Sequence, residues 1–217
     1  EAARIRILAC WRRQSEALID PNDPDSAYQL NLVNLEIGAL PPIMANFDHV
    51  QALRLENIAL SAEGAQAFVR QFPELRRLSL SNNRIESVPE ILDSLTRLRT
   101  LTLSRNPILV DSRGMQRLQR LSSLKILLLE GQGVNIAALL DVRRWPALME
   151  IRLRDCGLTV IPSGLGMRET LRHVDLRHNQ ITDIDGQTLH SIAGRTTLYL
   201  RLHQNPLNAE TIARAAT

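Results

Sequence analysis

The residues with the greatest capacity for chemistry lie in the last third of the chain, where charged and aromatic side chains alternate with aliphatic ones. They are Arg152, Arg154, His173, Asp175, Arg177, Tyr199, Arg201 and His203. Guanidinium groups form forked hydrogen bonds with carboxylates and stack on flat groups. Arginine and tyrosine are also enriched among the residues that dominate protein interfaces. Because Glu150 and Asp175 lie among the cations, the set is mixed in charge and suits a protein partner better than a nucleic acid.

Two other interpretations of this set stay open. The arginines have short reach to the neighbouring acids, so they could form internal ion pairs on a solvated surface. His173, His203 and Asp175 could hold a metal ion if their segments are neighbours, although a chance grouping of surface residues explains them better. We therefore predict a protein-binding patch that holds no metal and no cofactor.

The sequence offers little support for catalysis. The motifs HExxH, CxxC, GxSxG, GxGxxG and the phosphate-binding loop do not occur. Cys156 could be proposed as a nucleophile, but in the segment RDCGL it takes the place that asparagine holds in similar segments. We predict a buried, inert thiol there and no enzyme activity in this sequence.

Composition supports a large leucine core. The chain has 217 residues, of which 44% are apolar, 3% are aromatic and, by count, 37 are leucine. This apolar content excludes a disordered chain. The net charge is +3, and the 25 arginines and one lysine are interspersed with acids, which argues against a nucleic-acid-binding surface. No apolar stretch approaches the ~18 residues of a membrane span, so we predict no membrane partner.

A repeat runs through most of the chain. Residues 75–85 (LRRLSLSNNRI), 98–108 (LRTLTLSRNPI) and 171–181 (LRHVDLRHNQI) share the pattern LxxLxLxxNxI, with Val174 for the second leucine in the third, and weaker copies lie between and around them. The second leucine of each LxL pair falls at Leu32, Leu55, Leu80, Leu103, Leu129, Leu153, Leu176 and Leu202. We number the repeats, or coils, one to eight after these leucines. Successive leucines are 23, 25, 23, 26, 24, 23 and 26 residues apart.

The repeat predicts one strand and one return segment in each coil. The LxL pairs alternate with polar residues, which is the period of a half-buried strand. Stacked coils place these strands side by side and parallel, and at ~4.8 Å per strand the sheet is roughly 34 Å across. We expect helical returns in coils two, four and five, and a short return in coil three, where Pro89 stops regular helix.

These segments resemble leucine-rich repeats, whose period is ~20–29 residues. The resemblance covers about residues 28 to 210. It implies an α/β solenoid, a curved right-handed horseshoe with parallel strands on the concave face and short helices or turns on the convex face. We assign residues 28–217 to this repeat domain of about eight repeats and expect the sequence to be a fragment that ends within a repeat.

An asparagine after each strand is expected to hold the stack together. A buried amide can pair with backbone groups at the turn, so stacked copies form a ladder. Asn83, Asn106, Asn179 and Asn205 hold this position, with Gln132 and Cys156 as substitutes and Leu35 and Ile58 as replacements in the first two coils. The ladder should therefore be weakest at the N-terminal end.

Residues 1–27 lie outside the repeat and are expected to form an N-terminal helical cap or flank. The segment from Ala3 to Gln14 predicts an amphipathic helix with Ile5, Leu8 and Trp11 buried against the first coil. A polar, turn-rich connector, DPNDPDS, follows it. An exposed end coil of a solenoid needs such a cap.

Finer features suggest a subfamily. The stretches VPEIL, NPI, NPL and RDCGLTVIP, together with the opening ILACWRRQ, resemble repeat regions of large bacterial effector- or toxin-like proteins. Many of those proteins carry a ubiquitin ligase domain of the bacterial novel type after the repeats. The resemblance implies a monomeric module that recognises the substrate, from a parent secreted by a bacterium into a host cell. The alternative is a scaffold or autoinhibitory domain that acts on its own parent protein.

Overall fold

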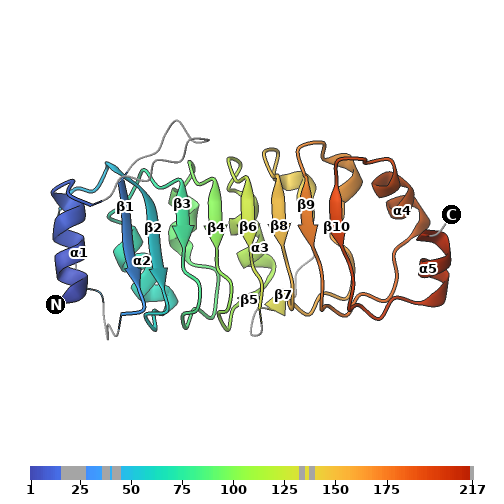
Figure 1. The fold of residues 1–217 in the computed structure, drawn as a ribbon, viewed down its shortest axis with the longest axis horizontal. Coiled ribbons are helices and arrows are strands. Elements are labelled where there is room, and N and C mark those ends of the chain that lie inside the picture. Colours follow the sequence, from blue (N-terminus) through green and yellow to red (C-terminus); the bar gives the residue numbers. More distant parts are fainter. Residues whose placement is uncertain (16–27, 36–39, 41–44, 132–134, 137–139, 216–217) are drawn as a thin grey trace.

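The computed structural model describes residues 1–15, 28–35, 40, 45–131, 135–136 and 140–215. Within them, eight parallel strands form one sheet whose order follows the chain (Figure 1). The strands are β1 (Tyr28–Val33), β2 (Val50–Glu56), β3 (Arg77–Ser79), β4 (Thr100–Thr102), β6 (Ile126–Leu128), β8 (Glu150–Arg152), β9 (His173–Asp175) and β10 (Tyr199–Arg201). Each contains residues of an LxL pair or its equivalent, so the predicted parallel register is confirmed.

The return segments lie away from this sheet, and α2 and α3 stand behind it in Figure 1. The helices and turns are α2 (Ala62–Val69), η1 (Glu90–Ser94), α3 (Ser112–Gln119), η2 (Val142–Arg144), η3 (Leu165–Met167), α4 (Gly186–Ala193) and α5 (Ala209–Ala215). The side chains of Ser61, Asp111 and Asp185 cap α2, α3 and α4 by accepting a hydrogen bond from a first-turn amide.

The predicted helix in the return of coil five is wrong in the described residues. Asn135–Ile136 is a short strand, β7, that pairs in parallel with β5 (Leu109–Val110). Val142–Arg144 makes only a 3₁₀ turn, which ends at Trp145. Pro146 follows, and a residue before proline is steered from helical to extended backbone. Residues 137–139 lie outside the described part of the chain.

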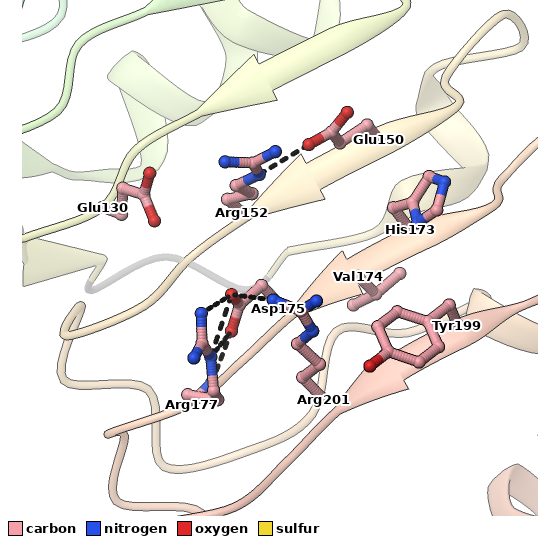
Figure 2. Close-up of a pocket in the computed structure, with 9 residues that line it drawn as sticks. All are labelled: Glu130, Glu150, Arg152, His173, Val174, Asp175, Arg177, Tyr199 and Arg201. Carbon is pink, nitrogen blue, oxygen red and sulfur yellow. Dashed lines mark hydrogen bonds and ion pairs between the residues drawn. The ribbon is translucent and has the colours of Figure 1, made fainter.

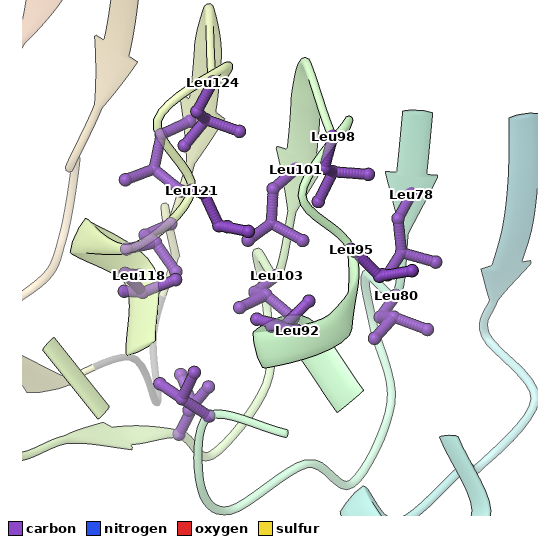
Figure 3. Close-up of a cluster of buried hydrophobic side chains, with 14 of the residues drawn as sticks. Leu78, Leu80, Leu92, Leu95, Leu98, Leu101, Leu103, Leu118, Leu121 and Leu124 are labelled. Atoms are coloured by element: carbon purple, nitrogen blue, oxygen red, sulfur yellow. The ribbon is translucent and has the colours of Figure 1, made fainter. Parts of the chain in front are cut away.

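The core consists of the predicted leucine columns. Leu80, Leu103, Leu153 and Leu176 are fully buried, as predicted. Figure 3 shows the leucines of coils three and four pointing into one shared interior. Trp145 is also buried and donates its indole N–H to the Leu118 carbonyl of the preceding coil at 2.7 Å. The buried side chains of neighbouring coils therefore belong to one core.

The asparagine ladder is present at Asn83, Asn106, Asn179 and Asn205, and each of these side chains joins its coil to the one before it. The Asn106 amide donates to the carbonyls of Leu80 and Leu103 at 2.9 and 2.8 Å. Its Oδ1 accepts from the backbone amides of Asn83 and Ile85 at 3.1 and 3.2 Å. Asn83 and Asn179 repeat this arrangement, whereas Asn205 accepts from one amide, that of Ile181. Gln132 lies outside the described residues.

A left-handed residue precedes each ladder position, which sequence reasoning missed. The backbone φ is positive at Asn34, Asn57, Asn82, Arg105, Gly131, Asp155, His178 and Gln204. This conformation turns the chain out of the strand so that the next side chain points inward. Asparagine and aspartate tolerate it better than most residues, and an asparagine or aspartate one residue before the ladder position was the available signal.

The N-terminal helix exists, but the predicted buried face is wrong. Helix α1 (Ala2–Trp11) packs beside β1 through Ile7 and Cys10. Ile5, Leu8 and Trp11 are instead exposed, with 58%, 37% and 48% of their surfaces accessible. The Cys10 carbonyl meets the His49 ring at 2.9 Å and the Cys10 thiol lies 3.8 Å from the Gln29 carbonyl, and these contacts hold the face with Ile7 and Cys10 against the sheet. Residues 16–27 lie outside the described part of the chain.

Candidate functional site

Strands β8, β9 and β10 place the predicted chemistry in two rows. In the first row, Glu150 lies beside His173, which lies beside Tyr199. In the second, Arg152 lies beside Asp175, which lies beside Arg201. These residues alternate with Ile151, Val174 and Leu200, which face the interior or pack against it. We call the side of the sheet that carries both rows the open face.

The rows surround a hollow of about 310 Å³ on the open face (Figure 2). It is lined by Glu130, Glu150, Arg152, His173, Val174, Asp175, Arg177, Tyr199 and Arg201. Six of the eight predicted binding residues therefore come together. Arg154 and His203 do not line the hollow: Arg154 lies 3.3 Å from the Asp155 carboxylate, and His203, two residues after Arg201, is exposed. Sequence reasoning missed Glu130, which enters from the neighbouring coil.

Asp175 is the electrostatic centre of the hollow. Its side chain is only 8% exposed, and Arg177 grips it with a fork in which Nε lies 2.8 Å from Oδ1 and Nη2 lies 2.6 Å from Oδ2. The Arg177 backbone amide adds a third donor at 3.2 Å. Burial disfavours the charged carboxylate, but these hydrogen bonds outweigh it and lower the pKa of Asp175 below its ordinary value. The pair is therefore internally satisfied.

Arg201 is held differently. Its guanidinium carbon lies 4.9 Å from the centre of the Tyr199 ring, within the range of a cation–π contact. Its Nη1 is 3.9 Å from Asp175 Oδ2, which is too long for a hydrogen bond. The Tyr199 ring also meets the His173 ring edge-on, with centroids 6.2 Å apart. Arg201 is thus positioned by stacking while its N–H groups face the hollow.

Arg152 is paired at one atom only. Its Nε donates to Glu150 Oε1 at 2.5 Å, and its side chain is 47% exposed. Such exposed ion pairs contribute little to stability. The alternative interpretation, that the arginines form ion pairs with neighbouring acids, therefore holds for Arg177 and only in part for Arg152.

Cys156 occupies the ladder position as predicted. It is fully buried, and its thiol lies 2.6 Å from the Leu129 carbonyl. Burial, followed by the nearby charges of Asp155 and Glu130, raises the pKa of this thiol far above its ordinary value. A nucleophilic cysteine requires the opposite shift.

Two further features concern metals and membranes. In the described residues, histidine, cysteine and acidic side chains form no group of three that could hold a metal ion. The helices among those same residues are all too short or too polar to cross a bilayer.

A second hollow, of about 410 Å³, lies on the return side between α2, η1 and α3. Its Arg117 is paired with Glu90 and Asp93 of the preceding coil. Sequence reasoning gave no signal for this hollow. Its second arginine, Arg113, is 76% exposed and lies 3.6 Å from Glu90.

Comparison with known proteins defines the class. Family models for leucine-rich repeats match residues 73–114, as two copies, and residues 169–189. An internalin from Listeria monocytogenes has a similar fold, with a TM-score of 0.59 and 20% identity over 86% of this chain and 57% of that one. The fold is an α/β leucine-rich repeat solenoid. Such repeats typically serve as interaction modules for other proteins.

The curated relatives that match this chain are much longer proteins. Tubulin-specific chaperone E from Bos taurus is 28% identical over 68% of this chain and 31% of its own length. The human volume-regulated anion channel subunit LRRC8A is 25% identical over 75% of this chain and 24% of its own length. The chain thus spans about a third or less of these two relatives.

Proposed function

We propose that the chain is a protein-binding module whose partner contacts the open face of coils six to eight. The observation that carries this proposal is the hollow, where two rows of side chains from three strands converge around Asp175. Arginine and tyrosine of this kind dominate protein interfaces. Equal numbers of acids and arginines line the hollow, which argues against a nucleic-acid backbone as ligand.

We also propose a biological setting, which rests on sequence resemblance alone. The VPEIL and RDCGLTVIP stretches support a substrate-recognition domain of a secreted bacterial effector with a ubiquitin ligase domain outside this sequence. The relatives described above bear other names, a tubulin chaperone and an anion channel subunit. Sequencing the parent gene tests this part, and a parent without a ligase domain would contradict it.

The alternative is a module that scaffolds or closes over another domain of its own parent. The mixed charge of the hollow would serve that role equally well. Binding to a separate protein distinguishes the two, because an autoinhibitory module would bind its own neighbouring domain in preference to any foreign protein.

The proposal is tested by capture with the folded chain as bait, followed by two charge-reversed baits. The first bait carries Arg152→Glu and Arg201→Glu. The second carries Arg54→Glu, a matched control because Arg54 occupies the same row on β2, is 48% exposed and pairs with Glu56 at 2.8 Å. A true partner is captured by the native chain and the control but not by the double variant.

Circular dichroism and thermal melting must show that all three baits are folded. Equal capture by the double variant would overturn the assignment of the hollow. Loss of capture by the Arg54 control alone would move the binding site to the first coils.

A further inference from the structure

We propose that the hollow recognises a single side-chain carboxylate, a glutamate or aspartate on an acidic segment of the partner, held between Arg152 and Arg201. This inference rests on the proposed function and names the chemistry of the same site. The donors, the local charge and the aromatic wall each support it.

The donors are distributed unevenly among the three arginines. Arg177 directs its Nε and Nη2 to the Asp175 carboxylate. In the described part of the chain, neither Nη atom of Arg152 makes a hydrogen bond, and no nitrogen of the Arg201 guanidinium does. A guanidinium offers five N–H groups in a fixed plane, so two arginines with open donors face one hollow.

The geometry places these two arginines on either side of Asp175. Arg152 and Arg201 belong to one row and are separated by the intervening strand β9. Two strand spacings amount to ~9.6 Å, which leaves room for a carboxylate whose two oxygens each meet one guanidinium. The Asp175 carboxylate lies in the same row but is bonded to Arg177 on its own strand segment, and it stays 3.9 Å from the nearest nitrogen of Arg201 (Figure 2).

Local charge limits the ligand to one negative charge. Arg152, Arg177 and Arg201 are balanced by Glu130, Glu150 and Asp175. A phosphate group, with a charge near −2, would meet three carboxylates within one small hollow. A singly charged, planar carboxylate matches the forked donors and meets less repulsion.

The aromatic wall explains why a side chain in a peptide fits better than a free ion. Tyr199 is 54% exposed and stands at the edge of the hollow beside His173. An apolar residue next to the acid can rest on this ring, which adds contact area at low entropic cost. The segment we propose is therefore an acid flanked by apolar residues.

Four short peptides test the inference, three with blocked ends and one with a free C-terminus. Their binding is followed by NMR through the arginine Nε–H signals of the folded chain. The first is acetyl-Leu-Glu-Leu-amide in a short neutral frame. The second has glutamine for glutamate, the third has phosphoserine, and the fourth keeps glutamine and has a free C-terminal carboxylate. We expect the glutamate peptide to shift the Arg152 and Arg201 signals and to bind at least tenfold more tightly than the glutamine peptide.

Variants locate the effect. Arg201→Lys keeps the charge but loses the fork, so we expect about a tenfold loss for the glutamate peptide. Arg54→Glu should change its affinity less than twofold. Equal binding of the glutamate and glutamine peptides would overturn the inference. So would preference for phosphoserine or for the free C-terminus, because each of those results names a different ligand.

Failure of this inference is distinguishable from failure of the proposed function. If a protein partner is lost on charge reversal of Arg152 and Arg201 but no glutamate peptide binds selectively, the module binds protein by other contacts. If the glutamate peptide binds selectively but the captured partner is insensitive to the reversal, the carboxylate site stands and the partner surface lies elsewhere.

Discussion

Coils three and four share a scaffold with coils six to eight but present a different surface. In both regions a buried asparagine, Asn106 or Asn179, bridges two coils, and the leucines beneath are fully buried. On the open face, the row of small residues at Ser79 and Thr102 becomes the charged row of Arg152, Asp175 and Arg201. Because both regions keep the same buried leucines and asparagines while the outward row differs, surface chemistry can change along the solenoid without altering the fold.

The largest effects should come from the scaffold and be similar in the two regions. Leu103→Ala and Leu176→Ala each remove a fully buried side chain, so each should lower the free energy of unfolding by ~2–5 kcal/mol. Urea unfolding measures both. A loss in one region with none in the other would show that the coils do not form one equivalent core.

The ladder should give the next largest effect. Asn106→Ala leaves three carbonyls and two backbone amides without their side-chain partner and should cost about 2–3 kcal/mol, as should Asn179→Ala. Ser79→Ala, on the open face of coil three, is the control and should be within ~0.5 kcal/mol of the native chain. A ladder variant as stable as this control would refute the bridging role.

The two regions should differ in their response to acid. The pKa of Asp175 is lowered in the folded chain, so its ion pair stabilises the fold above the ordinary pKa of ~3.9 and is lost as pH falls through the folded value. Asp175→Asn should cost about 1–2 kcal/mol at pH 7, and this difference should shrink below about pH 4. A difference that stays constant down to pH 2 would mean that Asp175 is not ionised in the folded state.

The smallest expected effect is that of a thiol reagent on Cys156, the residue that replaces asparagine at the ladder position of coil six. Because burial covers this thiol and raises its pKa, a thiol reagent should modify it only when the chain opens, so the rate in the folded chain should be far below that in the urea-unfolded chain at the same pH. Rapid modification in the native state would show that the ladder position is accessible.

The sequence predicted the scaffold well because its rules are local and repeated. Leucine spacing alone located the eight strands, and the asparagine positions located the ladder. It failed where a segment has no repeat to support it. In α1, amphipathic spacing favoured Ile5, Leu8 and Trp11, but the contact with β1 is made by Ile7 and Cys10.

The sequence predicted most of the residues that line the hollow, but not which of them form ion pairs with one another. Alternation with aliphatic residues placed Arg152, Arg177 and Arg201 on one face. Nothing in their spacing showed that Arg177 would form an ion pair with Asp175, or that Arg201 would stack on the Tyr199 ring. That division depends on side-chain geometry across strands, and it decides which donors remain for a partner.

Photo-crosslinking tests the central claim most directly. A benzoylphenylalanine replaces Tyr199 in one variant and Ser79 in another, which places the same reactive group on the open face of each region. With the captured partner present, we expect a crosslinked product from position 199 and none from position 79. Crosslinking from position 79 alone, with both variants folded, would contradict the assignment of binding to coils six to eight.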